Sequence, residues 1–123
     1  MHTVIETPTF LRDVERLGIS TTERAIIVGK LALDPTAGDL MPSTGGARKV
    51  RIAGRGKGKS GGYRIVTYYA TDDIPVFLLA VISKGERTNL SKAEQNELRK
   101  ELSGLADDYR ASVRTRVAKI GRK

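Results

Sequence analysis

The chain has 123 residues, 39% of them hydrophobic and 29% charged, which is typical of one globular domain. It has no cysteine, so disulfides and thiolate chemistry are excluded, and its apolar runs are too short to span a bilayer. The formal net charge of +8 favours a polyanionic partner such as nucleic acid or the ribosome.

The positive charge is concentrated in two parts of the sequence. Residues 1–39 carry six acids and four bases, whereas residues 40–71 carry seven bases and no acid. Residues 110–123 carry six bases and no acid. This distribution indicates a basic surface with a binding role, because charge that served only solubility would be spread along the chain.

A short strand and two helices are predicted in the first 35 residues. The strand covers residues 3–6, and the first helix opens at Pro8 after a threonine cap and ends at Gly18. The second helix begins after one of the hydroxyl residues at 20–22 and stops at Asp34 and Pro35. The N-terminal residues have no charged segment followed by an apolar one, so we expect no signal peptide and a cytoplasmic protein.

The second half of the chain has the pattern of consecutive strands followed by a helix. Residues 37–46 are predicted to form a loop, and strands are predicted over 48–52, 63–69 and 76–82. Ser91 and Glu94 form a capping-box pattern that opens a final helix, and the basic residues from 110 onward extend that helix or form a disordered tail. We therefore expect an α+β fold, with an antiparallel sheet of three to four strands, two N-terminal helices and one C-terminal helix.

The first strand of this sheet alternates basic and apolar residues. With a period of two, Lys49 and Arg51 lie on one face, while Val50 and Ile52 face the core. In the partner strand Tyr68 and Tyr69 lie on opposite faces. The register is not fixed by the sequence, so which tyrosine joins the basic face stays open.

The connection between these strands, GRGKGKSGG, alternates glycine with Arg55, Lys57 and Lys59. Glycine allows backbone N–H groups to approach a phosphate closely, and the lysines add charge. The spacing is not that of a Walker loop, and ATP binding is not expected. Together with the acid-free flanks, the loop predicts contact with phosphates.

Several kinds of catalytic chemistry have little support in this sequence. The single histidine, His2, lies beside the initiator methionine, and no group of His or acidic residues has metal-ligand spacing. We therefore expect no metal and no cofactor. Lys, Arg and Tyr remain, and these side chains stabilise charge on a phosphate or exchange protons. RNA supplies its own nucleophile in the ribose 2′-hydroxyl, so such a set would suffice to cleave RNA.

The stretch TGGARKVRIAGRGKGKSGGYRIVTYY, residues 44–69, resembles the signature of RelE/ParE-superfamily toxins, specifically the HigB-like branch of bacterial type II toxin–antitoxin systems. The flanking segments LALDPTAGDLMPSTGG and FLLAVISKGERTNLSKAEQNELRKEL are similar to that branch as well, so the resemblance covers roughly residues 3–110. It implies a RelE-like, microbial-RNase-like α+β fold, with a single toxin domain over 1–109 and a basic extension over 110–123.

The resemblance also implies a function, partners and site residues. It implies a metal-independent endoribonuclease that cleaves mRNA in the ribosomal A site and arrests translation. Its partners would be the ribosome, mRNA and a cognate helix-turn-helix antitoxin similar to HigA, with no membrane. The expected catalytic residues are Arg51, Lys57, Arg64 and Lys84. The expected RNA-binding residues are Arg48, Lys49, Arg55, Lys59, Tyr68 and Tyr69.

Roles for these residues follow from their chemistry. Arg51 and Arg64 are expected to hold the scissile phosphate, because a guanidinium matches its geometry. Lys57 or Lys84 would exchange protons or stabilise the pentacovalent oxyanion. Tyr68 or Tyr69 would stack on a base.

Two other functions remain open at this point. A ParE-like relative would share the fold but poison DNA gyrase, and a non-catalytic RNA- or ribosome-binding module would present the same basic face. The dense Lys and Arg set on the first two strands of the sheet favours the nuclease.

Overall fold

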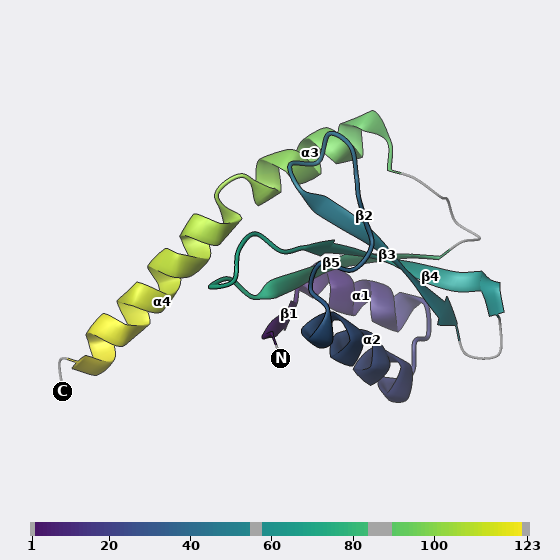
Figure 1. Ribbon diagram of the computed structural model, residues 1–123, viewed down its shortest axis with the longest axis horizontal. Helices are drawn as coiled ribbons and strands as arrows, with labels where there is room; N and C mark the ends of the chain where they lie inside the picture. The colour runs from purple at the N-terminus through teal and green to yellow at the C-terminus, as the bar shows by residue number, and fades with distance from the viewer. Residues whose placement is uncertain (1, 55–57, 84–89, 122–123) are drawn as a thin grey trace.

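The computed structural model describes residues 2–54, 58–83 and 90–121 (Figure 1). Its elements in chain order are β1 (Val4–Glu6), α1 (Pro8–Arg16), α2 (Thr21–Leu33), β2 (Asp39–Leu40), β3 (Ala47–Gly54), β4 (Gly58–Tyr68), β5 (Val76–Ser83), α3 (Lys92–Leu102) and α4 (Leu105–Gly121). The predicted α+β class is confirmed. Among the described residues, no helix combines the length and the apolar character needed to cross a membrane.

Side-chain caps start the first three helices. The Thr7 hydroxyl accepts a hydrogen bond from the N–H of Phe10, with Pro8 at the first helical position of α1. Ser20 caps α2 and Ser91 caps α3, each in a reciprocal capping box with a glutamate three residues on. The predicted starts of these helices are therefore confirmed.

The five strands form one sheet in the order β1-β5-β4-β3-β2. β1 pairs with β5 in parallel, and the remaining neighbours are antiparallel. The strand β2 was not expected, because Asp39 and Leu40 lie in the segment predicted as loop. Two residues are too few to show a period of two, and they are held as a strand by pairing with Lys49 and Arg48.

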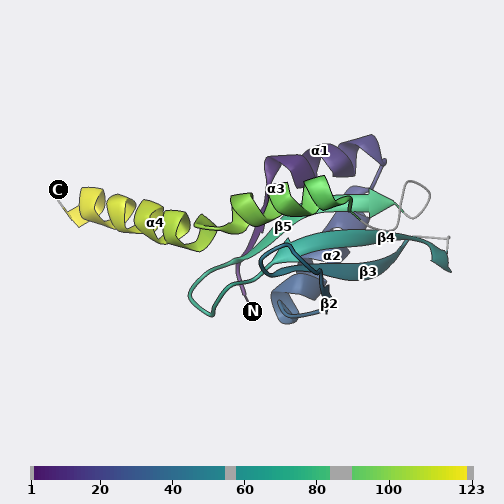
Figure 2. The ribbon, with the colours of Figure 1, turned by 90° about the horizontal axis from the view of Figure 1, so that it is seen from above.

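Each face of the sheet carries its own apolar core. The helices that cover the sheet are seen from the side in Figure 1 and from above in Figure 2. On one face, Val50 and Ile65 pack with Phe10 of α1 and Leu31 of α2. On the other face, residues of β3, β4 and β5 pack with Leu98 and Leu102 of α3. The prediction that Val50 and Ile52 face a core is confirmed. The helices α1 and α2 therefore leave the opposite face to α3, which covers only part of it.

The C-terminal region forms two helices where one was predicted. Gly104 has a φ of +103°, which glycine adopts easily, and it separates α3 from α4. The basic segment continues α4 to Gly121, so the expected boundary between residues 109 and 110 falls inside a helix. Arg110 pairs with Asp73 at 2.8 Å, and Tyr109 meets Phe77 edge-on at 6.1 Å between ring centroids. Beyond these contacts, α4 projects away from the sheet (Figure 1).

Candidate nucleic-acid interface

The antiparallel register of β3 and β4 brings several of the predicted site residues to one face. Arg51 lies directly opposite Arg64, and Lys49 lies opposite Val66 two positions along. Tyr68 lies opposite Ala47 on the same face, beside α3. We call Lys49, Arg51, Arg64 and Tyr68 the basic sheet face. The question of which tyrosine joins the basic residues is thereby answered in favour of Tyr68.

Arg64 is the most unusual member of the basic sheet face. Its side chain is only 9% exposed, and its Nη1 is buried without a hydrogen-bond partner among the described residues. A buried donor without a partner is costly, and like charges directly across a strand pair destabilise a sheet. Arg51 supplies such a charge from the opposite strand. An anion bound between the two guanidinium groups would relieve both costs, and a phosphate fits their planar donor geometry.

Gly62, two residues before Arg64, sets the distance between β3 and β4. A Cβ atom at Gly62 would lie 2.3 Å from the carbonyl oxygen of Ile52, closer than any such contact allows. The ladder also shifts register between Ile52 and Gly54. The strands therefore approach closely beside the Arg51–Arg64 pair, and that approach fixes the position of the backbone that carries the two arginines.

Tyr68 lies at the other end of the basic sheet face. Beside it is a basic residue, Arg99, that the sequence did not indicate as part of the site. The Cε1 of Tyr68 would lie 3.3 Å from a Cβ at Gly46, and Arg99 Cγ would lie 3.3 Å from a Cβ at Gly45. Tyr68 and Arg99 both line a hollow of about 360 Å³. Arg99 is exposed and donates to Asn96 at 3.2 Å. A base in the last turn of a helix is common for dipole reasons, so the sequence carried no signal for this position.

Two of the expected RNA-binding residues lie away from the basic sheet face. Arg48 is on the opposite face of β3, and its Nη1 donates to the carbonyl oxygen of Thr36 at 3.1 Å. The hydroxyl of Tyr69 donates to Asp72 at 2.5 Å and lies 2.9 Å from His2 Nε2. The hydrogen bond to Asp72, followed by desolvation and the charge of Asp72, raises the pKa of Tyr69. Tyr69 therefore ties the N-terminus to the turn after β4.

Four of the expected site residues lie wholly or partly outside the described structure. Arg55, Lys57 and Lys84 lie outside the described residues, and Lys59 is described only as part of the β4 backbone. Within the described ranges, no three His, Cys, Asp or Glu side chains are grouped so that they could hold a metal ion. The described part of the site thus consists of two arginines, a lysine and a tyrosine, with Arg99 beside the tyrosine.

Comparison with known proteins gives the family of this fold. A family model described as the RelE toxin of the RelE/RelB toxin–antitoxin system matches residues 37–122, more than half of the chain. Among solved structures, the chain is similar to the E. coli toxin RelE in the free state, in a variant with two arginine-to-alanine substitutions. The identity is 16%, the match covers 81% of this chain and 95% of that one, and the TM-score is 0.50. At this identity the structural likeness supports the fold alone.

Proposed function

This chain belongs to the RelE toxin family, and on that premise we propose that it is a ribosome-dependent mRNA endonuclease that arrests translation by cutting mRNA in the A site. The observation that carries the proposal is the Arg51–Arg64 pair, in which Nη1 of Arg64 is buried and has no hydrogen-bond partner among the described residues. A scissile phosphate is the anion that would satisfy this donor. Membership of the RelE family supports RNA as the molecule that carries this phosphate.

The proposed reaction needs neither metal nor imidazole. The ribose 2′-oxygen attacks the adjacent phosphorus, the bond from phosphorus to O5′ breaks, and a 2′,3′-cyclic phosphate and a 5′-hydroxyl result. One proton leaves the 2′-hydroxyl and one is delivered to O5′. Arg51 and Arg64 would bind the non-bridging oxygens and stabilise the charge that develops on them. Lys57 and Lys84 are the residues proposed for proton exchange, since an amine with a lowered pKa can give and take protons.

The mRNA would be oriented by the rest of the basic sheet face. Tyr68 offers a ring for a base to stack on, a contact that tolerates any base sequence. Lys49 and the basic residues of the β3–β4 connection would contact phosphates of the mRNA backbone. Arg99 would add a further positive charge beside Tyr68. These contacts position the strand so that the scissile phosphate reaches Arg64.

A RelE toxin acts with a cognate antitoxin, as the description of its family as part of a RelE/RelB system implies. The motif of residues 44–69 supports the HigB-like branch, and hence a helix-turn-helix antitoxin similar to HigA. Translating ribosomes as the target place the protein's work in the cytoplasm.

The test is cleavage of a defined mRNA by the purified chain, with and without programmed ribosomes, mapped by primer extension. We expect cuts only within translated frames, with products that end in a 2′,3′-cyclic phosphate. Arg64→Ala should abolish these cuts, whereas Arg12→Ala, which removes an exposed cation on α1, should not. Breaks in DNA during gyrase turnover would indicate a gyrase poison instead. Ribosome binding without cuts would indicate a non-catalytic module.

A further inference from the structure

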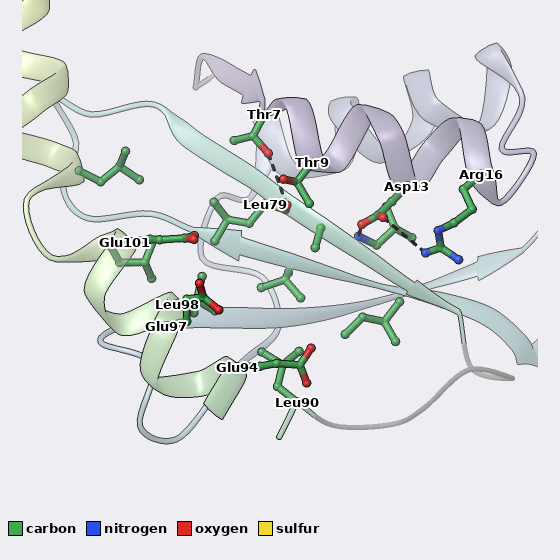
Figure 3. A pocket seen from close by; sticks show the side chains of 16 residues that line it. Thr7, Thr9, Asp13, Arg16, Leu79, Leu90, Glu94, Glu97, Leu98 and Glu101 are labelled. Carbon is green, nitrogen blue, oxygen red and sulfur yellow. Dashed lines mark hydrogen bonds and ion pairs between the residues drawn. The ribbon is translucent and has the colours of Figure 1, made fainter. Parts of the chain in front are cut away.

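A groove of about 470 Å³ lies between α1 and α3, over β5 (Figure 3). Its lining includes Ile82, the residue of β5 that pairs with Arg64, so the groove reaches the neighbourhood of the Arg51–Arg64 pair. Its floor is apolar, with Leu79, Ala80 and Leu98 among the residues that line it. β1 pairs with β5 only as far as Leu78, so within residues 2–54, 58–83 and 90–121 no strand pairs with the later residues of β5 on this side. The N–H of Val81 donates instead to Asp13 of α1 at 2.9 Å. The groove therefore exposes apolar surface where a sheet edge is left open.

The rim of this groove is acidic. Glu94, Glu97 and Glu101 lie on the side of α3 that faces the groove (Figure 3). Glu97 and Glu101 are exposed, and within the described ranges neither forms an ion pair. On the opposite wall, Asp13 pairs with Arg16 at 3.4 Å. An occupant of this groove would therefore combine an apolar side with positive charge.

The same chain carries an element with this chemistry in α4. From Arg110 onward the sequence has six bases and no acid, and residues 111–116 are exposed. Val113 is 36% exposed, and further apolar residues follow four and seven positions later in the sequence. This spacing gives a helix an apolar stripe. Most helical stability in proteins comes from packing, so the exposed residues 111–116 favour a partner for this part of α4.

The α4 helix cannot occupy the groove of its own chain. Arg110 donates to both carboxylate oxygens of Asp73, at 2.8 and 3.0 Å, and to Thr71 at 3.1 Å. Together with the Tyr109–Phe77 contact, these bonds hold the start of α4 against the turn between β4 and β5. From there α4 runs away from α1 and α3 in both views (Figures 1 and 2).

We propose that the free part of α4 binds in the groove of a second copy of this chain, and that two copies exchange these helices in a symmetric dimer. Residues 111–121 of α4 would span about 16 Å, the same length as the 11 residues of α3 that wall the groove. The apolar stripe that includes Val113 lies on the groove floor, and Arg114 and Arg116 lie near Glu97 and Glu101. An exchange of this kind is isologous, so both grooves are filled and no free end remains.

Sedimentation velocity and light scattering of the full chain test the dimer. We expect a dimer at micromolar concentration that dissociates as salt rises, because exposed charge pairs are screened. Two charge-reversal variants separate the sides of the contact: Glu97→Lys with Glu101→Lys in the groove, and Arg114→Glu with Arg116→Glu on α4. Each alone should weaken dimerisation at least about tenfold, because like charges then face each other.

A mixture of the two reversed variants gives the decisive measurement. In the heterodimer, the unchanged α4 of the groove variant, with its arginines, enters the unchanged acidic groove of the α4 variant. The glutamates introduced on α4 enter the groove that now carries lysines. Opposite charges therefore meet in both contacts, and the mixture should restore the dimer. A control variant with Arg12→Glu and Lys30→Glu changes the same net charge at exposed positions outside the groove, and should dimerise like the wild type. A wild type that stays monomeric at 
about 100-fold higher concentration overturns the proposal, as does a mixture that remains monomeric.

Discussion

Arg51 and Arg64 face each other directly across the β3–β4 ladder, and the guanidinium of Arg64 is buried with one nitrogen unpartnered among the described residues. Neither feature favours folding, because two cations repel each other and a buried donor loses its hydration. Features that oppose stability are expected at functional sites, where binding of a ligand compensates for them. This pair is therefore the place where stability and activity are expected to conflict.

Replacing Arg64 with an apolar side chain of similar length should separate these two properties. In Arg64→Met we expect the free energy of unfolding to stay constant or rise by about 1–2 kcal/mol, because the buried donor, which has no partner in the described part of the chain, is gone. Cleavage should fall by about 10²–10³-fold, the usual effect of removing one donor to a developing charge. Urea titration and mRNA cleavage rates measure both. A loss of stability of several kcal/mol would show that Arg64 is a structural residue.

Arg48 and Arg51 are a matched pair, because they lie on the same strand and face opposite sides of the sheet. Arg51→Ala should lower the cleavage rate strongly and reduce the salt dependence of ribosome binding, since one phosphate contact is lost. Arg48→Ala should leave both nearly unchanged, because its guanidinium contacts the carbonyl of Thr36 behind the sheet. Equal effects of the two substitutions would contradict the assignment of the site to one face.

The sequence predicted the elements well where local chemistry determines them. Thr7, Ser20 and Ser91 start helices through contacts three residues away, which a sequence pattern records. Alternation of basic and apolar residues likewise placed Lys49 and Arg51 on one face, as the register confirms. These features depend on neighbours in the chain and need no knowledge of the fold.

Other parts of the site depend on long-range contacts that no local pattern encodes. Tyr68 and Tyr69 were equivalent in the sequence, and only the pairing of Tyr68 with Ala47 shows which one lies on the same face as the basic residues. The ladder between β4 and β5 is also irregular after Val66, which a simple period of two does not anticipate. Arg99 approaches Tyr68 because α3 docks beside the glycines that precede β3.

The two neighbouring tyrosines should respond differently to substitution. Tyr68→Ala should weaken mRNA binding by about 5–150-fold, the equivalent of one lost stacking contact, whereas Tyr68→Phe keeps the ring and should bind normally. Tyr69→Phe should leave cleavage unchanged and lower the melting temperature, because it removes the hydroxyl that bonds to Asp72 and His2. Cleavage assays and thermal melts distinguish these outcomes. A binding defect in Tyr69→Ala together with normal binding by Tyr68→Ala would show that the nucleobase stacks on Tyr69 instead.

The anchor of α4 should depend on pH in the acid range. Hydrogen bonds from Arg110 and Thr71 lower the pKa of Asp73 below its ordinary value of about 3.9. The contact therefore stabilises the fold fully at a pH above the ordinary pKa of Asp73. This stability is lost as the pH falls toward the lowered pKa that Asp73 has in the folded protein. The difference in unfolding free energy between wild type and Asp73→Asn should be constant above about pH 5 and shrink below about pH 4.

A pair of glycine substitutions tests how closely the site depends on the approach of β3 to β4. A Cβ at Gly62 would collide with the backbone of Ile52, so Gly62→Ala should cost about 1–3 kcal/mol of stability and displace the strand that carries Arg64. A displacement of about 1 Å at a reacting group can cost about 10²-fold in rate, so cleavage should fall more than stability alone explains.

Gly29 provides the control, because it lies inside α2 with nothing within 4 Å of its Cβ position. Gly29→Ala should stabilise the protein by about 0.5–1 kcal/mol and leave cleavage unchanged, since alanine is the better helix former. Denaturant titrations at one temperature, paired with cleavage rates under conditions where both variants are folded, separate folding from catalysis. Normal cleavage by folded Gly62→Ala would mean that the guanidinium pair tolerates a shift of its strands, and the geometric basis of the proposed site would then fail.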